Sequence, residues 1–336
     1  MLKKIEDNNN YLINNQMSNE TGVYYKNVEF GYTKEDGRYM FKIDESIVNR
    51  YQVISSLGKG TFGNVILCED HKYKKKMALK IIKDIPRFVK AARTEIKILN
   101  LLYQNYCEKY NLVSINKHFI YNSHIFIVFD VYYKNLYELS LQRKTDSRIV
   151  SYTNQMLEGL SFLDKKNIVH LDLKPENVMV TDESLENIVI IDFGSSIVDN
   201  KKSLTYQQSR WYRSPEIITK YDEITTTKSD IWSLGCMIYE LYTYNPIFSG
   251  KTETEQLDRY IFLLGYPDHT FLNSCLNFSN YNFHPKKMIN RCQYKTEFNI
   301  DNDNMINFIK QCLYWTPYKR ITPNVKINSD WTYEII

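Results

Sequence analysis

The chain has 336 residues, 43% of them hydrophobic, which suits one large two-lobed domain or two ordinary ones. Its net charge of +4 at pH 7 is small, and its lysines are spread along the chain, which argues against nucleic acid as the main partner. No apolar run approaches the roughly 18 residues that cross a bilayer, and residues 1–19 are too polar for a secretory signal. We therefore expect a soluble protein of the cytoplasm, the nucleus or both, with neither a membrane nor a nucleic acid partner.

The cysteines show neither a C-x-x-C motif nor a Cys/His spacing typical of metal sites. In an intracellular protein, this pattern favours reduced thiols in the core. The six residues concerned are Cys68, Cys107, Cys236, Cys275, Cys292 and Cys312.

The first fifty residues divide into two parts. Residues 1–30 begin with a polar, asparagine-rich stretch that cannot bury much apolar surface, so we expect a disordered tail. In residues 31–50, apolar residues alternate around Asp36-Gly37, a dipeptide that favours hairpin turns. The sequence therefore predicts a small hairpin before the main domain.

Residues 51–67 read as two strands around a glycine-rich turn. Three glycines let backbone N–H groups approach a phosphate closely, although tight turns and dinucleotide-binding loops share this pattern. The dinucleotide interpretation expects a helix after the glycines, whereas a strand-like run follows here. The turn is Leu57-Gly58-Lys59-Gly60-Thr61-Phe62-Gly63-Asn64-Val65.

The next apolar strand, residues 77–82, contains a single lysine, Lys80, and a helical pattern follows at 88–103. We expect Ile96, Leu99 and Tyr103 to lie on one apolar stripe of that helix. Glu95 lies fifteen positions after Lys80 and could pair with it, the alternative being a solvated surface glutamate. Residues 125–131 then read as a buried strand that runs into an exposed segment.

A second helical pattern at 154–163 leads into the most informative stretch, His170-Leu171-Asp172-Leu173-Lys174-Pro175-Glu176-Asn177, which is followed by Asp192-Phe193-Gly194. Asp172 can accept a proton from a hydroxyl, and Lys174 can reach a phosphate. The amide oxygen of Asn177 and the carboxylate of Asp192 are hard ligands of the kind that Mg²⁺ accepts. This set of residues suits phosphoryl transfer.

The stretch resembles the H-R-D-L-x-x-x-N loop and the D-F-G motif of the eukaryotic protein kinases. The resemblance implies an α+β, bilobal fold over residues 51–332, with a small β-rich N-lobe carrying one regulatory helix (51–131) and a larger helical C-lobe (132–332). It also implies ATP and Mg²⁺ as cofactors and protein substrates, and we expect a monomer. A catalytically silent scaffold is the alternative, but such pseudokinases usually lose one of the six residues Asp172, Lys174, Lys80, Glu95, Asn177 and Asp192, which are all present here.

The resemblance also assigns roles to these residues. Asp172 would act as base, Lys174 and Lys80 would hold phosphates, Glu95 would position Lys80, and Asn177 and Asp192 would bind the metal. Phe129 would be the gatekeeper behind the adenine, with the hinge after it. The implied nucleotide contacts are Leu57, Gly58, Lys59, Gly60, Thr61, Phe62, Gly63, Asn64, Val65, Ala78, Lys80, Phe129, Asp130, Val131, Met179 and Ile191.

One residue departs from the kinase pattern, because Leu171 stands where the family has an arginine that grips a phosphorylated residue. A substitute lies downstream, where Tyr206 precedes Arg210 by four residues and Arg213 by seven. A phosphotyrosine would pair with such guanidiniums through charge-assisted hydrogen bonds. The alternative for Tyr206 is a packed aromatic residue in a chain that holds 28 tyrosines.

Residues 204–216 resemble Tyr-x-Gln-Ser-Arg-x-Tyr-Arg-Ser-Pro-Glu of the dual-specificity tyrosine-phosphorylation-regulated kinases, the DYRK family of the CMGC group. Residues 31–50 are similar to the box that precedes the catalytic domain in that family. This implies autophosphorylation on Tyr206 and later proline-directed activity on Ser and Thr. The Yak-like branch is preferred, and the homeodomain-interacting kinases are the alternative. Thr205, Ser203 and Ser209 lie close to Tyr206 and are further candidates for the modified residue.

The same resemblance assigns roles to five residues, of which Arg213 has already been named. Arg213 would favour proline after the acceptor residue, and Glu176 would meet an arginine on the other side of it. Glu216 would pair with Arg320, and Asp230 would brace the backbone of the catalytic loop, since buried carboxylates need such partners.

Overall fold

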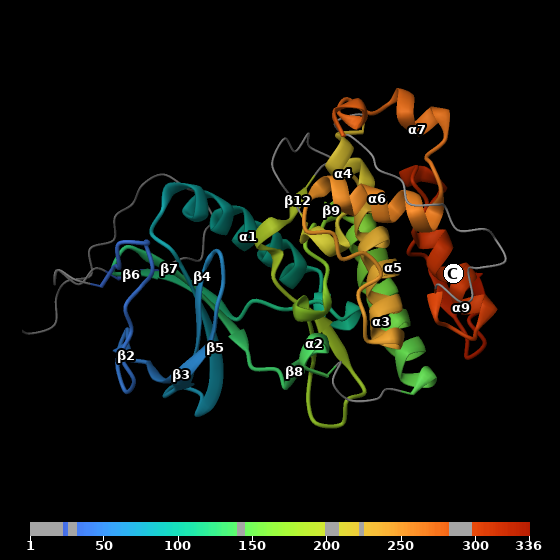
Figure 1. Ribbon diagram of the computed structural model, residues 1–336. Helices are drawn as coiled ribbons and strands as arrows, with labels where there is room; N and C mark the ends of the chain where they lie inside the picture. Colours follow the sequence, from blue (N-terminus) through green and yellow to red (C-terminus); the bar gives the residue numbers. More distant parts are fainter. Residues whose placement is uncertain (1–22, 26–31, 140–144, 199–207, 222–224, 282–297) are drawn as a thin grey trace, which may run out of the picture. The chain divides into compact units, whose positions relative to one another are not determined.

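The computed structural model describes residues 23–25, 32–139, 145–198, 208–221, 225–281 and 298–336. They form two compact units, one with the residues up to Asn100 and Ser114–Val131, the other with Leu101–Val113 and the residues from Tyr132 on. The first is built on a β-sheet and the second is mainly helical, which confirms the α+β expectation (Figure 1). Within these described ranges, no helix is both long and apolar enough to cross a membrane.

The sheet of the first unit has seven strands in the order β1-β6-β7-β5-β4-β3-β2. β1 runs parallel to β6, and the other neighbours are antiparallel. The strands are β1 (Val23–Tyr25), β2 (Ser46–Ile47), β3 (Tyr51–Lys59), β4 (Gly63–Asp70), β5 (Lys75–Ile82), β6 (Lys117–Tyr121) and β7 (His124–Asp130).

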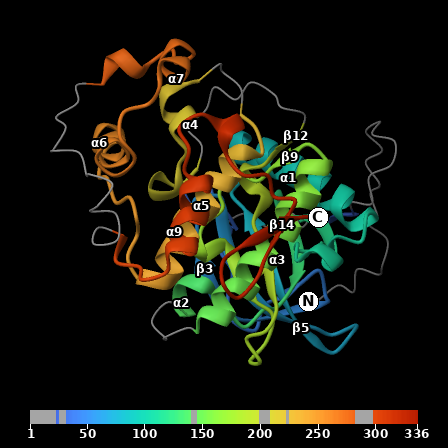
Figure 2. The same cartoon turned by 90° about the vertical axis from the view of Figure 1, so that its right-hand side faces the viewer.

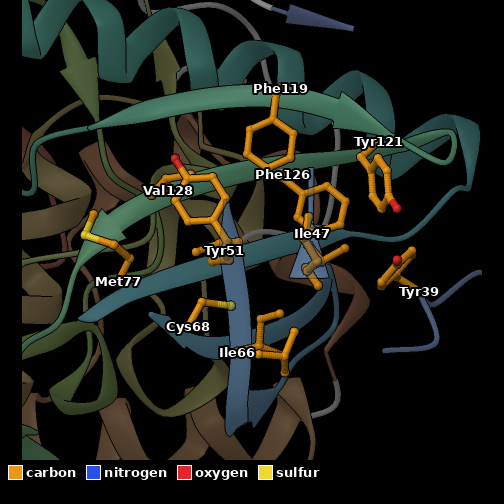
Figure 3. Packing of buried hydrophobic residues seen from close by; sticks show 13 residues of the cluster. Tyr39, Ile47, Tyr51, Ile66, Cys68, Met77, Phe119, Tyr121, Phe126 and Val128 are labelled. Atoms are coloured by element: carbon orange, nitrogen blue, oxygen red, sulfur yellow. The ribbon is translucent and has the colours of Figure 1, made fainter. Parts of the chain in front are cut away.

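One face of this sheet carries an aromatic core, because alternate strand residues point to the same side. The rings of Tyr51 and Phe119 stack at 5.8 Å between centroids, and Phe119 stacks on Phe126 at 5.1 Å. Tyr39, from the segment before β2, meets Phe126 edge to face at 5.4 Å (Figure 3). The segment that precedes the domain therefore contributes to its core.

Within residues 32–50, a turn is closed by a single antiparallel bridge between Thr33 and Tyr39, with Gly37 at φ 80°. The predicted hairpin is thus present in a shorter form, because its two arms meet at one bridge only. The strand that follows it, β2, pairs with β3 of the sheet. The predicted disordered tail is wrong for Val23–Tyr25, which form β1. Val-Tyr-Tyr has high strand propensity and adds to the edge of β6, while most of the tail lies outside the described residues.

The helix predicted at 88–103 is α1 (Pro86–Gln104), whose residues from Leu101 on group with the second unit. Ile96 and Leu99 are buried as expected, but Tyr103 is 59% exposed, so its place on the apolar stripe was wrong. Leu102 occupies the buried position instead, because it follows Leu99 by three residues and lies nearer the same face.

The second unit is organised around α3 (Asp146–Lys165), α5 (Lys228–Thr243) and α9 (Asp303–Cys312), which pack side by side (Figure 2). α3 is longer than the predicted 154–163. The other helices are α2 (Leu136–Leu139), α4 (Pro215–Thr219), α6 (Glu253–Leu264) and α7 (His269–Asn273), with short 3-10 turns at Cys107–Tyr110, Pro175–Asn177, Phe193–Ser195, Arg210–Tyr212, Phe278–Asn280 and Pro317–Lys319.

Three small antiparallel sheets complete this unit, in the orders β11-β10-β8, β12-β9 and β13-β14. The strands β9 and β10 flank residues 170–177, the candidate catalytic stretch, so the ends of this stretch are fixed by strand pairing. The strands are β8 (Lys134–Asn135), β9 (Ile168–Val169), β10 (Val178–Val180), β11 (Ile188–Ile190), β12 (Ile197–Val198), β13 (Val325–Ile327) and β14 (Tyr333–Ile335).

All the cysteines in the described part of the chain are free thiols. Four are buried and Cys275 is half-buried, while Cys292 lies outside the described residues. Burial raises the pKa of Cys68 to about 12, so this thiol stays protonated near neutral pH.

Candidate active site

The glycine-rich turn of the first unit connects β3 to β4. Its tip is closed by a hydrogen bond from the Gly60 N–H to the Gly63 carbonyl at 2.9 Å. A side chain at Gly63 would collide with the carbonyl of Ile81, so packing requires glycine there. At Gly58 and Gly60, by contrast, a Cβ would meet no protein atom within 4 Å, so the absence of side chains leaves backbone open to a ligand.

Lys80 of β5 and Glu95 of α1 form an ion pair, with 2.6 Å between Nζ and Oε1. Glu95 is only 2% exposed, and the pairing compensates the cost of burying its charge. The ring of Phe62, at the tip of the glycine-rich turn, lies edge-on to Phe88 of α1, and the Lys80 ammonium is 5.5 Å from its centroid. The lysine thus points to the same region as the turn.

Four of the residues predicted to contact the nucleotide in this unit, Val65, Ala78, Lys80 and Phe129, share one face of the sheet. Ala78 lies opposite Phe129, and Val65 lies opposite Lys80. Val65, Ala78 and Phe129 are half-buried, whereas Ile66, Leu79 and Val128, which lie next to them on the other face, are buried. Asp130 and Val131 are exposed, and the Asp130 carboxylate pairs with Lys75 at 2.9 Å. A half-buried apolar face beside a lysine suits an adenine nucleotide.

In the second unit, Asp230 of α5 holds the start of the catalytic stretch. Its two carboxylate oxygens accept the backbone N–H groups of His170 and Leu171 at 2.7 and 2.9 Å. Burial raises the pKa of the Asp230 carboxyl, and these two bonds act in the opposite direction. They also hold Leu171 in the left-handed region, at φ 61°.

His170 is fully buried and orients the residues around it. Its Nδ1 accepts the Asp172 N–H at 3.2 Å, so its Nε2 carries the proton that is donated to the Ile191 carbonyl at 3.0 Å. Its ring also meets Phe193 edge to face. The histidine therefore links the catalytic stretch to the Asp192-Phe193-Gly194 motif.

Three donors surround the carboxylate of Asp172. Lys174 Nζ lies 2.8 Å from Oδ2, and Asn177 Nδ2 lies 3.1 Å from the same oxygen. The Ser209 hydroxyl donates to Oδ1 at 2.8 Å, and Lys174 also reaches this hydroxyl at 3.1 Å. The carboxylate is 14% exposed, so it is fixed in place yet accessible.

The donor set for a metal consists of Asn177 and Asp192, which adjacent strands bring together. β10 pairs with β11, and the Ile191 N–H donates to the Asn177 carbonyl at 2.9 Å. The Nδ2 group of Asn177 is committed to Asp172, which orients its amide oxygen as the ligand. One carboxylate and one amide oxygen, with phosphate and water for the rest, fit a divalent ion such as Mg²⁺.

Comparison with known proteins agrees with this geometry. The family model of the protein kinase domain matches residues 51–332. The chain belongs to the protein kinase family. Membership implies ATP as a substrate and in general a divalent metal ion, together with protein substrates and the bilobal fold.

Relatives of the kinase carry DYRK names. It is 35% identical to the probable serine/threonine-protein kinase dyrk2 of Dictyostelium discoideum, over 91% of this chain and 35% of that protein. It is also 35% identical to the dual specificity tyrosine-phosphorylation-regulated kinase 4 of Homo sapiens (90% and 61%), and 34% identical to the DYRK-family kinase pom1 of Schizosaccharomyces pombe (90% and 29%). The chain thus spans between 29% and 61% of the length of these relatives. The Yak-like branch stays a prediction.

The remaining residues predicted to contact the nucleotide are divided between the two units. Met179 and Ile191 are half-buried beside strand residues that are buried, which leaves an apolar surface next to Asn177. Leu57, on the first unit, is 50% exposed at the start of the glycine-rich turn. Lys59 and Thr61 are exposed, and Asn64 is buried.

The kinase residues predicted to be regulatory are only partly described. Tyr206 lies outside the described residues, as do Ser203 and Thr205. Arg213 is 1% exposed, and its guanidinium donates to the Gln208 carbonyl at 2.6 Å and pairs with Glu253 at 3.1 Å. Arg210 donates to the Lys251 carbonyl at 2.6 Å. A phosphotyrosine that engaged Arg213 would have to share it with Glu253.

Ser209 is the residue of the kinase site whose position the sequence did not indicate, since we singled it out only as a candidate for modification. Gln208 explains the geometry. Its N–H donates to the Leu171 carbonyl at 3.1 Å, and its side-chain amide donates to Ser229 and Ser233 of α5. These contacts fix the next residue beside Asp172.

Replacing Ser209 by alanine is expected to lower kcat of the kinase about ten- to a hundredfold, because losing a hydrogen bond to a charged group costs about 1.5–3 kcal/mol. Steady-state rates on a serine peptide measure this effect. Ser209→Thr keeps the hydroxyl and should retain most of the activity. Equal rates for wild type and Ser209→Ala would show that the hydroxyl does not position Asp172.

Proposed function

We propose that this kinase transfers the γ-phosphate of ATP to serine and threonine in proteins, after it has phosphorylated its own Tyr206. The observation that carries the proposal is the carboxylate of Asp172, which Lys174, Asn177 and Ser209 hold in place while it remains accessible. A fixed, exposed carboxylate can orient an acceptor hydroxyl and take its proton.

The other roles follow from charge. Lys80, aligned by Glu95, would hold the α- and β-phosphates, and Lys174 would neutralise the group in transfer. Asn177 and Asp192 would bind Mg²⁺, which, when present, neutralises negative charge on the phosphates. The chain's own contribution is to orient the acceptor and to place cations before the reaction starts.

The dual-specificity part of the proposal rests on the DYRK relatives and on the sequence around Tyr206. Several relatives are named dual specificity kinases regulated by tyrosine phosphorylation. In this chain, Leu171 cannot bind a phosphate as an arginine would, because it is an apolar side chain with no exposed surface. We propose that Arg210 and Arg213 receive the phosphate of Tyr206 instead.

The substrate preference that we propose is an arginine before the acceptor and a proline after it. Glu176 is exposed and lies two residues beyond Lys174, so its carboxylate is available to a basic side chain. Arg213 is fixed against the carbonyl of Gln208, close in sequence to Ser209, and would shape the pocket for proline. We further propose that the kinase acts as a monomer in the cytoplasm, the nucleus or both.

The proposed activity is tested with purified protein, radiolabelled ATP, Mg²⁺ and a peptide with the pattern Arg-x-x-Ser-Pro. We expect phosphate on the serine, and we expect removal of the metal with EDTA to abolish transfer. In peptide arrays, replacing the proline should lower the rate, and Glu176→Ala should remove the preference for arginine. A protein that binds ATP but phosphorylates no peptide and no protein would support the scaffold alternative instead.

A further inference from the structure

The turn at residues 33–39, which precedes the catalytic domain, contacts the glycine-rich turn of the same unit. The Nη2 group of Arg38 donates to the Gly60 carbonyl at 3.1 Å. At the other end of the turn, the amide of Asn64 donates to the Tyr39 carbonyl at 3.2 Å. Both ends of the glycine-rich segment 60–64 are thus tied to residues that lie outside the domain matched at 51–332.

The guanidinium of Arg38 is itself held in position. Its Nη1 group forms an ion pair with Asp36, and the Arg38 N–H donates to the other oxygen of that carboxylate at 3.2 Å. Arg38 is only 23% exposed as a side chain. One nitrogen is therefore fixed by the carboxylate, and the next is directed at Gly60.

The base of this turn is anchored to the sheet. The hydroxyl of Thr33 lies 2.8 Å from Nε2 of His124, whose Nδ1 lies 2.8 Å from the Ile82 carbonyl. His124 is fully buried, and Tyr39 packs against Tyr121 and Phe126 in the core (Figure 3). Because the base of the turn at residues 33–39 is rigid, the hydrogen bond from Arg38 to Gly60 restricts the glycine-rich turn.

The same turn also holds the segment that leads into α1. The Asp84 N–H donates to the Gly37 carbonyl at 2.8 Å, and a side chain at Gly37 would lie 2.7 Å from Ile85. Gly37 adopts φ 80°, which disfavours other residues. This contact runs through the backbone, so the Arg38 side chain can be removed without disturbing it.

We propose that Arg38 is a positioning residue for the nucleotide, because its guanidinium tethers the Gly60 carbonyl and so pre-orders the phosphate-binding turn. Glycine has the largest conformational entropy to lose, and a turn with open space around Gly58 and Gly60 must lose it when phosphates bind. A tether moves part of that cost from binding to folding. The proposal rests on the proposed function, in which ATP is the phosphoryl donor.

The consequence is a selective effect on nucleotide binding. The ion pair of Lys80 with Glu95 joins β5 to α1 and does not require the Arg38 guanidinium, which donates to Gly60. Loss of the tether should therefore raise the KM for ATP more than it lowers kcat. A residue that only supported the fold would instead lower thermal stability, kcat and nucleotide affinity together.

The experiment compares Arg38→Ala with Lys34→Ala, a cation of the same turn whose hydrogen bonds here run through its backbone. For Arg38→Ala we expect the KM for ATP and the Kd of a non-hydrolysable ATP analogue to rise about three- to tenfold, as for the loss of one hydrogen bond. We expect kcat to change less than twofold and the amides of residues 58–63 to exchange faster with deuterium. Lys34→Ala should behave as wild type, and Asp36→Ala should show a smaller rise in the same direction.

Equal nucleotide affinities for Arg38→Ala and Lys34→Ala would overturn the proposal, as would a loss that tracks a falling melting temperature. Analogue binding needs no phosphoryl transfer. The experiment can therefore contradict the role of Arg38 and the proposed function independently of each other. A wild type that binds the analogue more tightly than Arg38→Ala but transfers no phosphate would retain the tether and contradict the proposed function. A wild type that binds no nucleotide would contradict both.

Discussion

Replacing Asp172 by asparagine is expected to lower the rate of peptide phosphorylation about a thousandfold, within the range for removal of a positioned general base. The amide has nearly the shape of the carboxylate, so Lys174 and Ser209 keep a neighbour, but it cannot accept a proton. Single-turnover rates at saturating ATP measure this step without product release. The Kd for the ATP analogue should change little.

Glu183→Gln is the matched control, because it removes an exposed carboxylate from the same unit. It should leave the rate unchanged, and both variants should melt within a few degrees of wild type. If Asp172→Asn retained a tenth or more of the wild-type rate, another group would have to be the base, and the role assigned to Asp172 would be wrong.

The second large effect concerns the fold of the helical unit. Replacing Arg320 by methionine should lower the free energy of unfolding by about 3–5 kcal/mol, because the carboxylate of Glu216 is then buried without its partner. Two hydrogen bonds of 2.7 and 2.6 Å join these residues, which are 0% and 2% exposed. Arg320 also donates to the carbonyls of Tyr314, Lys228 and Trp315. Urea denaturation followed by tryptophan fluorescence measures the loss.

Lys319→Ala provides the control one residue away. Lys319 pairs with Asp268 at 2.6 Å, but both side chains are more than 40% exposed, and such pairs contribute only about 0–1 kcal/mol. If Arg320→Met lowered the free energy of unfolding no more than Lys319→Ala does, the stabilising role assigned to the Glu216–Arg320 ion pair would be wrong. Adding Glu216→Gln to Arg320→Met should restore part of the stability, since no buried charge then remains.

The same ion pair makes stability depend on pH. Burial alone would raise the pKa of Glu216, but the neighbouring Arg320 guanidinium outweighs it and holds this pKa below its usual 4.5. The stabilisation is therefore complete above pH 4.5 and is lost as pH falls through the lower folded value. Melting temperatures between pH 3 and pH 7 should show this loss in wild type, whereas Glu216→Gln should lack that part of the pH dependence. Parallel curves for the two proteins would contradict the assignment.

The residues that the sequence predicted best are those whose chemistry and spacing are local. Asp172 and Asn177 are five residues apart on one loop, and their side chains meet as the phosphoryl-transfer pattern requires. The pairing of Lys80 with Glu95 was also predicted and is confirmed at 2.6 Å. The contact of Glu216 with Arg320 and the contact of Asp230 with the catalytic stretch were predicted from the same family pattern, because a buried carboxylate needs a specific partner.

What the sequence did not predict depends on contacts between distant segments. Ser209 reaches Asp172 across 37 residues only because Gln208 is anchored on α5. Arg38 reaches Gly60 because the turn before the domain packs on the sheet, and no local pattern marks that arginine. Tyr103 was misplaced since the stripe was extended by four residues from Leu99, where the buried position is Leu102.

Peptide mass spectrometry of protein made in bacteria can show whether the chain is an active kinase that matures by modifying its own Tyr206. Wild type, Asp172→Asn and Tyr206→Phe are compared after treatment with Mg²⁺ and ATP. We expect phosphate on Tyr206 in wild type, none on that peptide in Asp172→Asn, and reduced peptide phosphorylation by Tyr206→Phe. A wild type that carries phosphate on Ser203, Thr205 or Ser209 but not on Tyr206, or that carries none at all, would contradict this expectation.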